Sequence, residues 1–306
     1  RVPNGKEIKV RVSARDFAGN VMKPEEWSWT MDYSLDKRPP TVPEITCPTM
    51  PIKFRHTFES GTEGWRNLRG DVWGARVQQK VRDKESGDQC LRLSARRGPR
   101  SFLSALAFTN KYDLEKYPLL SFDYLLPKKT KVNLWVHVNG HWYELQMTAS
   151  RTAYTKVGKL ATIQADGKWH HCVLDLREMV RKKRPNANKL VVNRIGFGDK
   201  GRDNRGNAYW MVDDFMVSGY GRPEAEFEWN ARDITGVEGY EVLFGNDRAA
   251  EFTNEITTRE KRGNFAGAAP GTRWLRVRAR DTAGNWSAPA TFSYIVKGGG
   301  PDRKHD

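Results

Sequence analysis

The chain of 306 residues lacks the features that mark several protein classes. It has three cysteines, Cys47, Cys90 and Cys172, and no C-x-x-C pair. A disulfide framework and a zinc or redox site built on paired cysteines are therefore excluded, although one disulfide bond remains possible. No apolar run approaches the roughly eighteen residues that a membrane-spanning helix needs. Walker loops, dinucleotide fingerprints and G-x-S-x-G sequences are also missing, which excludes the chemistries that depend on them.

Acidic residues are fewer than basic ones, since 37 Asp and Glu stand against 52 Lys and Arg, a net charge of +15. Eleven Trp, ten Tyr and thirteen Phe indicate a folded chain. The positive excess predicts attraction to a polyanion such as an acidic polysaccharide or an anionic cell surface, unless the basic runs are merely solvated loops. Nucleic acid is not expected, because no recognition motif or stacking aromatic accompanies those runs. They include Arg96 and Arg97, Lys128 and Lys129, residues 181–184, and an exposed row of Arg276, Arg278 and Arg280 in the final strands.

An internal repeat gives the first positive information about the fold. Residues 10–20 (VRVSARDFAGN) match residues 275–285 (LRVRARDTAGN) at eight of eleven positions. Each copy alternates between apolar and polar residues, as a half-buried strand does, and then reaches a turn at D-x-A-G-N. A second strand follows each copy. The pattern resembles the final hairpin of fibronectin type III or bacterial Ig-like domains.

The second copy has strands upstream of it, whereas the first copy does not. Residues 225–231 and 236–244 alternate like strands and precede the hairpin at Pro270 and Gly271. Residues 1–36 would therefore be half a domain. Either the chain is a piece of a longer protein, which residue 1 being Arg in mid-strand also suggests, or another chain supplies the missing strands.

The stretch between the two copies suggests an insertion. Residues 41–45 (TVPEI) resemble the opening strand of a fibronectin-like domain, but its next strand is found only at residues 227–229. We therefore expect residues 53–220 to be inserted between these two strands, as loop insertions are tolerated where chain ends lie close together. The alternative is a set of domains in series.

The middle segment reads as short alternating strands separated by Gly, Asn and Pro. Three motifs follow one another: TFESGTEGW at residues 57–65, ESGDQCLRL at 85–93 and YWMVDDF at 209–215. Their order and spacing resemble jelly-roll carbohydrate-binding modules of the galactose-binding-like type. The resemblance implies an all-β fold, a β-sandwich jelly-roll combined with fibronectin type III-like β-sandwich domains.

A hairpin centred on Asn139 and Gly140 is the most legible local structure. Asn-Gly between alternating runs predicts a two-residue type I′ turn, which pairs Val138 with His141 and His137 with Trp142. One face of the hairpin is then apolar and belongs to a core. The opposite face collects Lys131, Asn133, Trp135, His137, Trp142, Glu144, Gln146 and Thr148.

That second face has the chemistry of sugar recognition. Flat aromatic rings such as Trp135 and Trp142 suit the C–H faces of a sugar, and amides and a carboxylate suit its hydroxyls. Asp123 on the preceding strand could join them. Two alternatives remain open, because outward aromatic residues also pack against loops or adjacent domains, or are simply exposed.

Modules of this type commonly carry one structural calcium ion. The resemblance implies that Glu59 and Asp213 are its carboxylate ligands, with carbonyl oxygens near Ser86 and Gly87 completing an all-oxygen site. Asp214 is expected on the opposite face of its strand. The alternative is that Glu59 caps a turn and Asp213 pairs with an arginine.

The sequence does not favour an enzyme. The E-x-D-x-x-E strand of jelly-roll glycosidases is absent, as are the R-x-E-x-R and Q-I-H strands of jelly-roll lyases. His170 and His171 are adjacent in a strand, so their side chains point to opposite faces and do not readily share a metal.

These observations predict a non-catalytic recognition module at the cell exterior, part of a larger surface or secreted protein that binds a polysaccharide or another anionic surface polymer. The alternative is a structural subunit, such as a stalk, adhesin or filament, that self-associates through the N-terminal half-domain. The expected organisation is a fibronectin-like hairpin (1–36), a linker and possible first strand (37–52), the jelly-roll (53–220), a fibronectin-like domain (221–297) and a tail (298–306).

Overall fold

The computed structural model describes residues 3–67, 75–82, 88–95, 104–149, 154–199, 204 and 208–298. The fold is all-β, and the chain divides into two compact units. One comprises residues 1–46, 228–263 and 274–292, and the other comprises residues 47–227, 264–273 and 293–306. None of the helices in these described ranges is both long and apolar enough to cross a membrane.

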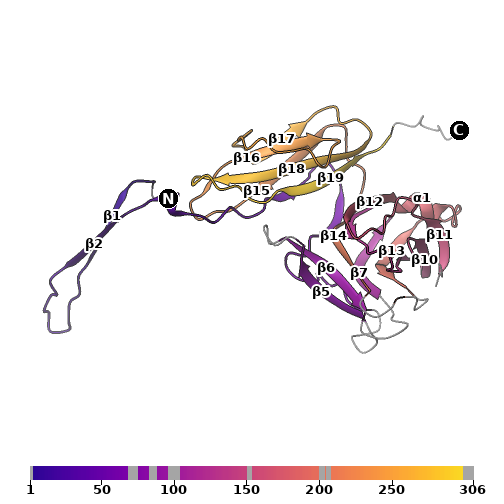
Figure 1. The fold of residues 1–306 in the computed structure, drawn as a ribbon, viewed down its shortest axis with the longest axis horizontal. Coiled ribbons are helices and arrows are strands. Elements are labelled where there is room, and N and C mark those ends of the chain that lie inside the picture. Colours follow the sequence, from indigo (N-terminus) through magenta and orange to yellow (C-terminus); the bar gives the residue numbers. More distant parts are fainter. Residues whose placement is uncertain are drawn as a thin grey trace. The chain divides into compact units, whose positions relative to one another are not determined.

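The larger unit holds a five-stranded sheet and a six-stranded sheet (Figure 1). The five-stranded sheet has the order β11-β10-β9-β13-β7, with β7 (Ser104–Asp113), β9 (Asn133–Val138), β10 (His141–Gln146), β11 (Thr155–Lys159) and β13 (Val191–Gly198). The six-stranded sheet has the order β12-β8-β14-β6-β5, with β5 (Ala75–Val81), β6 (Gln89–Ala95), β8 (Leu119–Leu125), β12 (Trp169–Asp175) and β14 (Tyr209–Ser218). Strand β4 (Ile52–His56) pairs with the second half of β14.

Aromatic side chains fill the core between these sheets. Phe197 of β13 lies 5.2 Å from the ring of Phe122 on β8 and 5.9 Å from that of Trp65, and Trp65 meets Phe215 at 4.9 Å. All four are almost completely buried. Burying one Phe side chain stabilises the fold by about 1.5–3 kcal/mol, so this cluster contributes several kcal/mol to the stability of the unit. Cys90 and Cys172 are buried in the same unit as free thiols.

The Asn-Gly hairpin forms as the sequence predicts. Strand β10 pairs antiparallel with β9, with His141 opposite Val138 and Trp142 opposite His137. Asn139 and Gly140 both have positive φ angles, 49° and 83°, which a type I′ turn requires. The register therefore places alternate residues of both strands on one outward face.

One short helix, α1 (Leu176–Arg181), follows directly after β12. Its N-cap is Asp175, whose carboxylate accepts a hydrogen bond from the Glu178 amide at 2.7 Å. This satisfies one of the amides that a helix start leaves without a partner.

The remaining strands form two three-stranded sheets and a separate hairpin. The first sheet has the order β17-β15-β3 and the second β16-β18-β19. Their strands are β3 (Glu44–Thr46), β15 (Ala225–Asn230), β16 (Val237–Gly245), β17 (Arg262–Phe265), β18 (Gly271–Asp281) and β19 (Ala290–Val296). Because Thr46 of β3 lies opposite Glu228 of β15, the chain leaves this sheet after β3 and returns to it only at β15. The domain limits read from the sequence stay predictions.

The two copies of the repeat adopt the same turn. In the first, Asp16 accepts hydrogen bonds from the backbone and side-chain nitrogens of Asn20, both at 2.8 Å. In the second, Asp281 accepts the same two bonds from Asn285, also at 2.8 Å. The D-x-A-G-N motif thus forms a turn in which the Asn donates two hydrogen bonds to the Asp carboxylate.

The surroundings of the two copies differ. The first copy lies in the hairpin of β1 (Glu7–Val12) and β2 (Glu25–Thr30), where Trp27 and Trp29 are about half exposed, at 50% and 48%. In the second copy, Leu275 and Val277 are completely buried, and the strand that carries them pairs with β16 in a larger sheet.

The arginine row of β18 is not the freely exposed stripe that the sequence suggested. Arg278 lies over the rings of Phe252 and Trp286 at 4.5 and 4.3 Å, and its guanidinium donates to the buried Glu241 at 2.6 Å. Arg276 lies over Phe252 at 4.6 Å. The sequence could not show this, because Phe252 lies 24 residues before Arg276 and Glu241 lies 37 residues before Arg278 in the chain.

Candidate functional site

The outward face of the β9–β10 hairpin carries a cluster of aromatic rings. The ring of Trp142 stacks on Tyr154 with centroids 5.2 Å apart and planes tilted by 18°. Trp135 meets Tyr154 edge-on at 5.4 Å, and His137 lies 4.9 Å from Trp142. Trp142, Tyr154 and His137 are half-buried, so part of this cluster reaches solvent.

Tyr154 is a member that the sequence prediction missed. It precedes β11, which pairs in parallel with β10, so Thr155 lies opposite Tyr143. Two parallel strands are not joined by a short turn, so no turn motif in the sequence predicts that β11 lies beside β10. Tyr154 also lies in a polar stretch without a strand pattern. We find no local signal that would have identified it.

Trp135 does not form part of an exposed platform, contrary to the expectation that both tryptophans are open to a ligand. It is only 1% exposed and packs against Trp142 and Tyr154 of its own sandwich. Its ring also lies against Gly198 of β13, where an added Cβ would overlap it. Trp135 therefore supports the cluster from beneath, while Trp142 and Tyr154 form its surface.

Asn133 and Glu144 are bonded within the protein. The Asn133 amide donates to the Glu144 carboxylate at 2.6 Å, and the other carboxylate oxygen accepts the Tyr154 amide at 3.1 Å. Both side chains are buried, Glu144 being 1% exposed. Asn133 and Glu144 are expected from the sequence to bind sugar hydroxyls. In the structure they bind each other, and Glu144 holds the backbone of Tyr154.

The remaining polar residues of the face are nearer to solvent. His137 shares a 2.5 Å hydrogen bond with Asn193, and Gln146 accepts one from Lys156 at 2.5 Å. Gln146 also donates to the Ala149 carbonyl at 3.1 Å. His137 and Gln146 are therefore half-buried on the outward face, and their contact with a ligand stays a prediction.

Asp123 does not join this face. It belongs to β8 of the six-stranded sheet and is buried, with His171 at 2.7 Å and Arg82 at 2.9 Å. The guanidinium of Arg82 lies 4.2 Å over the Trp169 ring. Asp123 alternates with the core residues Phe122 and Tyr124, but the sequence could not show that β8 and β9 belong to different sheets.

The residues predicted to bind calcium are only partly together. Asp213 of β14 accepts the guanidinium of Arg82 at 2.6 Å, which is the arginine pairing left open as an alternative. Glu59 accepts the Gln89 amide at 2.9 Å and is hydrogen-bonded to Asp88. Ser86 and Gly87 lie outside the described residues. Asp214 forms its own ion pair with Arg55 at 2.5 Å.

Asp88 and Asp213 in this corner both have raised pKa values, mainly because their carboxyl groups are buried. Burial, opposed by Arg82 and reinforced by Asp214 and Glu59, raises the pKa of Asp88 to about 7. The pKa of Asp213 is raised as well, by burial and by the charge of Asp214. A carboxylate pair such as Glu59 and Asp88 is a donor set that suits a hard divalent cation.

A second group of carboxylates lies in the smaller unit. Oxygens of Asp36, Asp233 and Asp281 come within 4.8 Å of one another. Asp233 accepts the amides of Thr235 and Gly236, and Asp281 holds the D-x-A-G-N turn. Asp16 accepts the same hydrogen bonds in the first copy of the repeat, so turn formation explains why residue 281 is an aspartate.

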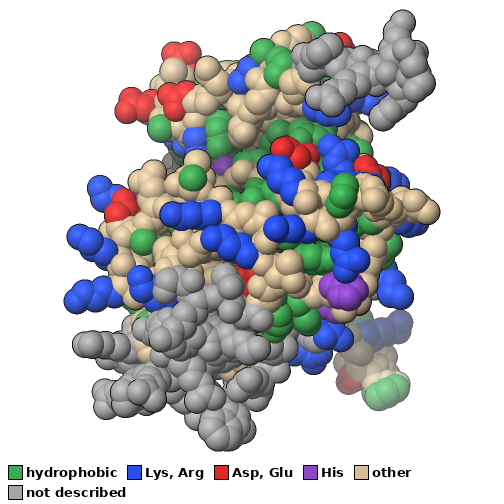
Figure 2. All heavy atoms as spheres, turned by 90° about the vertical axis from the view of Figure 1, so that its right-hand side faces the viewer, with side chains coloured by type: hydrophobic (Ala, Val, Ile, Leu, Met, Phe, Trp, Pro, Cys, Tyr) green, Lys and Arg blue, Asp and Glu red, His purple; other side chains and the backbone are tan. Residues whose placement is uncertain are grey.

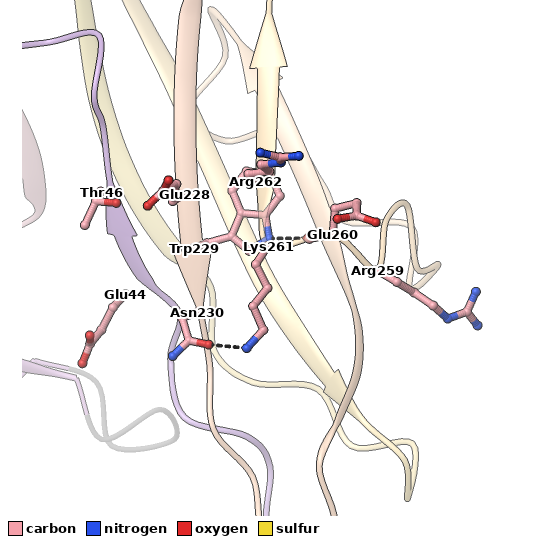
Figure 3. A pocket seen from close by; sticks show the side chains of 9 residues that line it. All are labelled: Glu44, Thr46, Glu228, Trp229, Asn230, Arg259, Glu260, Lys261 and Arg262. Atoms are coloured by element: carbon pink, nitrogen blue, oxygen red, sulfur yellow. Dashed lines mark hydrogen bonds between the residues drawn. The ribbon is translucent and has the colours of Figure 1, made fainter.

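A shallow hollow of about 590 Å³ lies over the sheet of β3, β15 and β17 (Figure 3). Lys261 donates to Asn230 at 2.7 Å, and the indole of Trp229 donates to the Glu260 carbonyl at 3.0 Å. Its lining has carboxylates and cations in equal number, so charge does not select a ligand here. The charged members are Glu44, Glu228, Glu260, Arg259, Lys261 and Arg262.

No family model matches the sequence, and no curated protein matches it significantly. Solved structures do resemble the chain. Carbohydrate-binding modules are among them. A family 11 module from Clostridium thermocellum, in complex with a β-1,3-1,4-mixed-linked tetrasaccharide, is 15% identical with a TM-score of 0.30, over 55% of this chain and 95% of the module. A xylan-binding domain from Paenibacillus barcinonensis is 17% identical with a TM-score of 0.27, over 55% and 94%.

The chain also resembles larger proteins. A β-1,2-glucanase from Parabacteroides distasonis is 14% identical with a TM-score of 0.32, and the match covers 85% of this chain. The chain spans 39% of the length of that glucanase.

Proposed function

We propose that the chain is a non-catalytic recognition module that binds a polysaccharide on the outward face of its five-stranded sheet. The observation that carries this proposal is the stacked pair of Trp142 and Tyr154, half-buried on a face whose other partly exposed side chains, such as His137 and Gln146, are polar. Aromatic faces of this kind pack against the C–H faces of sugars while nearby polar groups bind hydroxyls. His137 lies 4.9 Å from the Trp142 ring, and Gln146 is a half-buried polar side chain on the same face of β10.

The architecture of the face supports binding rather than structure alone. The buried Asn133–Glu144 pair anchors the Tyr154 backbone, and Trp135 fills the space beneath the rings. The two outer rings are therefore held in place before any ligand arrives, which reduces the entropy lost on binding.

A non-catalytic role fits the carboxylates of this face. Hydrolysis of a glycosidic bond normally uses two carboxyl groups that flank the bond. Among the described outward positions of β9, β10, β11 and β13, Glu144 is the one carboxylate, and it is buried. We place the module outside the cell, within a larger surface or secreted protein, because its partner polymer would be found there.

The substitution Trp142→Ala tests the proposal. It should abolish retention on immobilised polysaccharides, with mannan, mixed-linkage glucan and polygalacturonate as probes, because the outer ring of the stacked pair is lost. Trp27→Ala is the matched control, since Trp27 is half exposed in the separate β1–β2 hairpin. Circular dichroism and the melting temperature should be unchanged in both variants. Full retention by the Trp142 variant, or no retention of any probe by the unsubstituted chain, would refute the proposal.

We also propose a structural calcium ion at the corner formed by Glu59 and Asp88. The support is the hydrogen bond between these two carboxyl groups, together with the burial and the neighbouring charges of Asp214 and Glu59 that raise the pKa of Asp88. Asp213 would add to the negative field, although one of its oxygens already accepts Arg82. Calcium there would offset carboxylate repulsion and tie the segment before β5 to the start of β6.

One observation favours the alternative of a structural subunit. On the β1–β2 hairpin, Ile8 lies opposite Trp29 and Val10 opposite Trp27, so the apolar residues share one face. Every described residue of β2 is exposed. Light scattering of the intact chain distinguishes the two functions, since a chain that self-associates through this face would form dimers or larger species that disappear in the Trp27→Ser/Trp29→Ser variant.

A further inference from the structure

The pairing of β10 with β11 places two lysines beside the aromatic cluster. Lys156 lies opposite Glu144, and Lys159 lies opposite Gln146, so both belong to the outward face. Both are exposed at the edge of the five-stranded sheet. Because the register shifts between them, they lie opposite residues only two positions apart on β10, which is about 7 Å along the strand.

A third cation lies on the other side of the cluster. Arg194 of β13 is opposite His137, which in turn is opposite Trp142, so the three side chains form one row across the sheet. Arg194 is half-buried. The aromatic rings are therefore flanked by cations on both sides.

The acidic residues near this face do not balance that charge at its surface. Glu144 is 1% exposed and is bonded to Asn133 and to the Tyr154 amide. Asp199, just beyond the end of β13, is equally buried and accepts the Asn204 amide at 2.9 Å. Among the described residues of these strands, the charges that reach solvent are Lys156, Lys159 and Arg194.

The wider surface is basic as well. On the side of the molecule drawn in Figure 2, Lys and Arg side chains are more frequent than Asp and Glu. A surface of this kind attracts anions from a distance, whereas cations placed beside an aromatic cluster can bind them locally. The long-range attraction depends on the total charge of the surface, whereas local binding depends on particular lysine and arginine side chains.

We infer that the polysaccharide bound on this face is anionic, and that Lys156 and Lys159 bind its acidic groups while Trp142 and Tyr154 stack on its sugar rings. Two cations spaced along one strand suit a polymer with repeated charges. Carboxylate and sulfate groups share this chemistry, and both pair with an ammonium group. The inference rests on the proposed function, because it assigns the ligand class of the same face.

Isothermal titration calorimetry at physiological salt, with polygalacturonate, dextran sulfate and neutral dextran as separate probes, tests this inference. The unsubstituted chain should bind one or both polyanions and bind dextran at least tenfold more weakly. The Lys156→Gln/Lys159→Gln variant should lose at least about tenfold in affinity for the polyanion, because a charge-assisted bond contributes about 1.5–3 kcal/mol. The carboxylated and sulfated probes distinguish the two anionic groups.

The matched control is Lys80→Gln/Lys168→Gln, which removes the same charge from exposed positions on β5 and before β12. It should lower the affinity less than about twofold at this salt concentration, because distant charges are screened. An equal loss in both double variants would show general charge attraction and overturn the inference. Binding of dextran, mannan or mixed-linkage glucan that needs Trp142 but not the lysines would overturn it while leaving the proposed function intact. Binding of no polysaccharide would remove both.

Discussion

At the scale of single residues, Gly198 shows how the aromatic cluster is seated. Trp135 is a large side chain on the outward face, yet it is buried because its ring lies across β13 at a position without a side chain. The glycine acts here through close approach of the indole and not through an unusual backbone angle. Residue 198 therefore controls the height of the rings above the sheet.

Gly198→Ala should lower the free energy of unfolding by about 1–3 kcal/mol, because the new methyl group must displace the Trp135 ring. It should also weaken polysaccharide binding, since Trp135 supports Tyr154. Urea denaturation measures the first effect and calorimetry the second.

Gly245→Ala is the control for this prediction. A Cβ at residue 245 would meet no atom within 4 Å. Its stability should stay within about 0.5 kcal/mol of the unsubstituted chain. Equal stability of the two variants would mean that Trp135 is not seated on Gly198.

At the scale of single elements, β18 shows how a charged strand can be largely internal. Its apolar residues Leu275, Val277 and Ala279 face a core, as alternation predicts. Its arginines face outward but are covered by the rings of Phe252 and Trp286. A row of positive residues in a sequence is thus not by itself a polyanion site.

Arg278→Met should lower the free energy of unfolding by about 3 kcal/mol. The change removes the partner of Glu241, whose carboxylate is fully buried, and leaves a buried charge without its arginine. The apolar stem keeps most of the contact with Phe252. Chemical denaturation followed by circular dichroism measures the loss.

Arg259→Met provides the comparison, because that arginine is 74% exposed and lies 3.9 Å from Glu238. Exposed ion pairs contribute little, so this variant should change stability by less than about 1 kcal/mol. If the Arg278→Met variant lost as little stability as Arg259→Met, the buried Glu241 carboxylate would not need Arg278 for its stabilisation.

At the scale of the whole molecule, calcium should raise the melting temperature of the chain after it has been stripped with EGTA. A ligand that binds only the folded state adds about 2.7 kcal/mol to the free energy of unfolding when its free concentration is one hundred times its dissociation constant. The increase should disappear in Asp88→Asn and persist in Glu178→Gln, a change on the exposed side of α1. Differential scanning calorimetry with calcium, magnesium or EGTA gives the comparison. Identical melting temperatures in calcium and EGTA would count against a calcium ion.

The sequence by itself determined the local structure. Alternation fixed which residues of β9 and β10 face outward, the Asn139–Gly140 pair fixed their register, and the D-x-A-G-N motif fixed two identical turns. Each of these depends on residues within about ten positions of one another, where side-chain direction and turn chemistry are decided.

Only the tertiary structure decided which of those outward residues meet. In the tertiary structure Tyr154 stacks on Trp142, and Asn133 donates a hydrogen bond to Glu144. Asp123 is separated from these four residues because β8 belongs to the other sheet. These contacts depend on the order of strands in a sheet, and neighbouring strands there can be far apart in the chain or parallel. Exposure follows from the same order, because whether an outward side chain reaches solvent depends on what the adjacent strand carries.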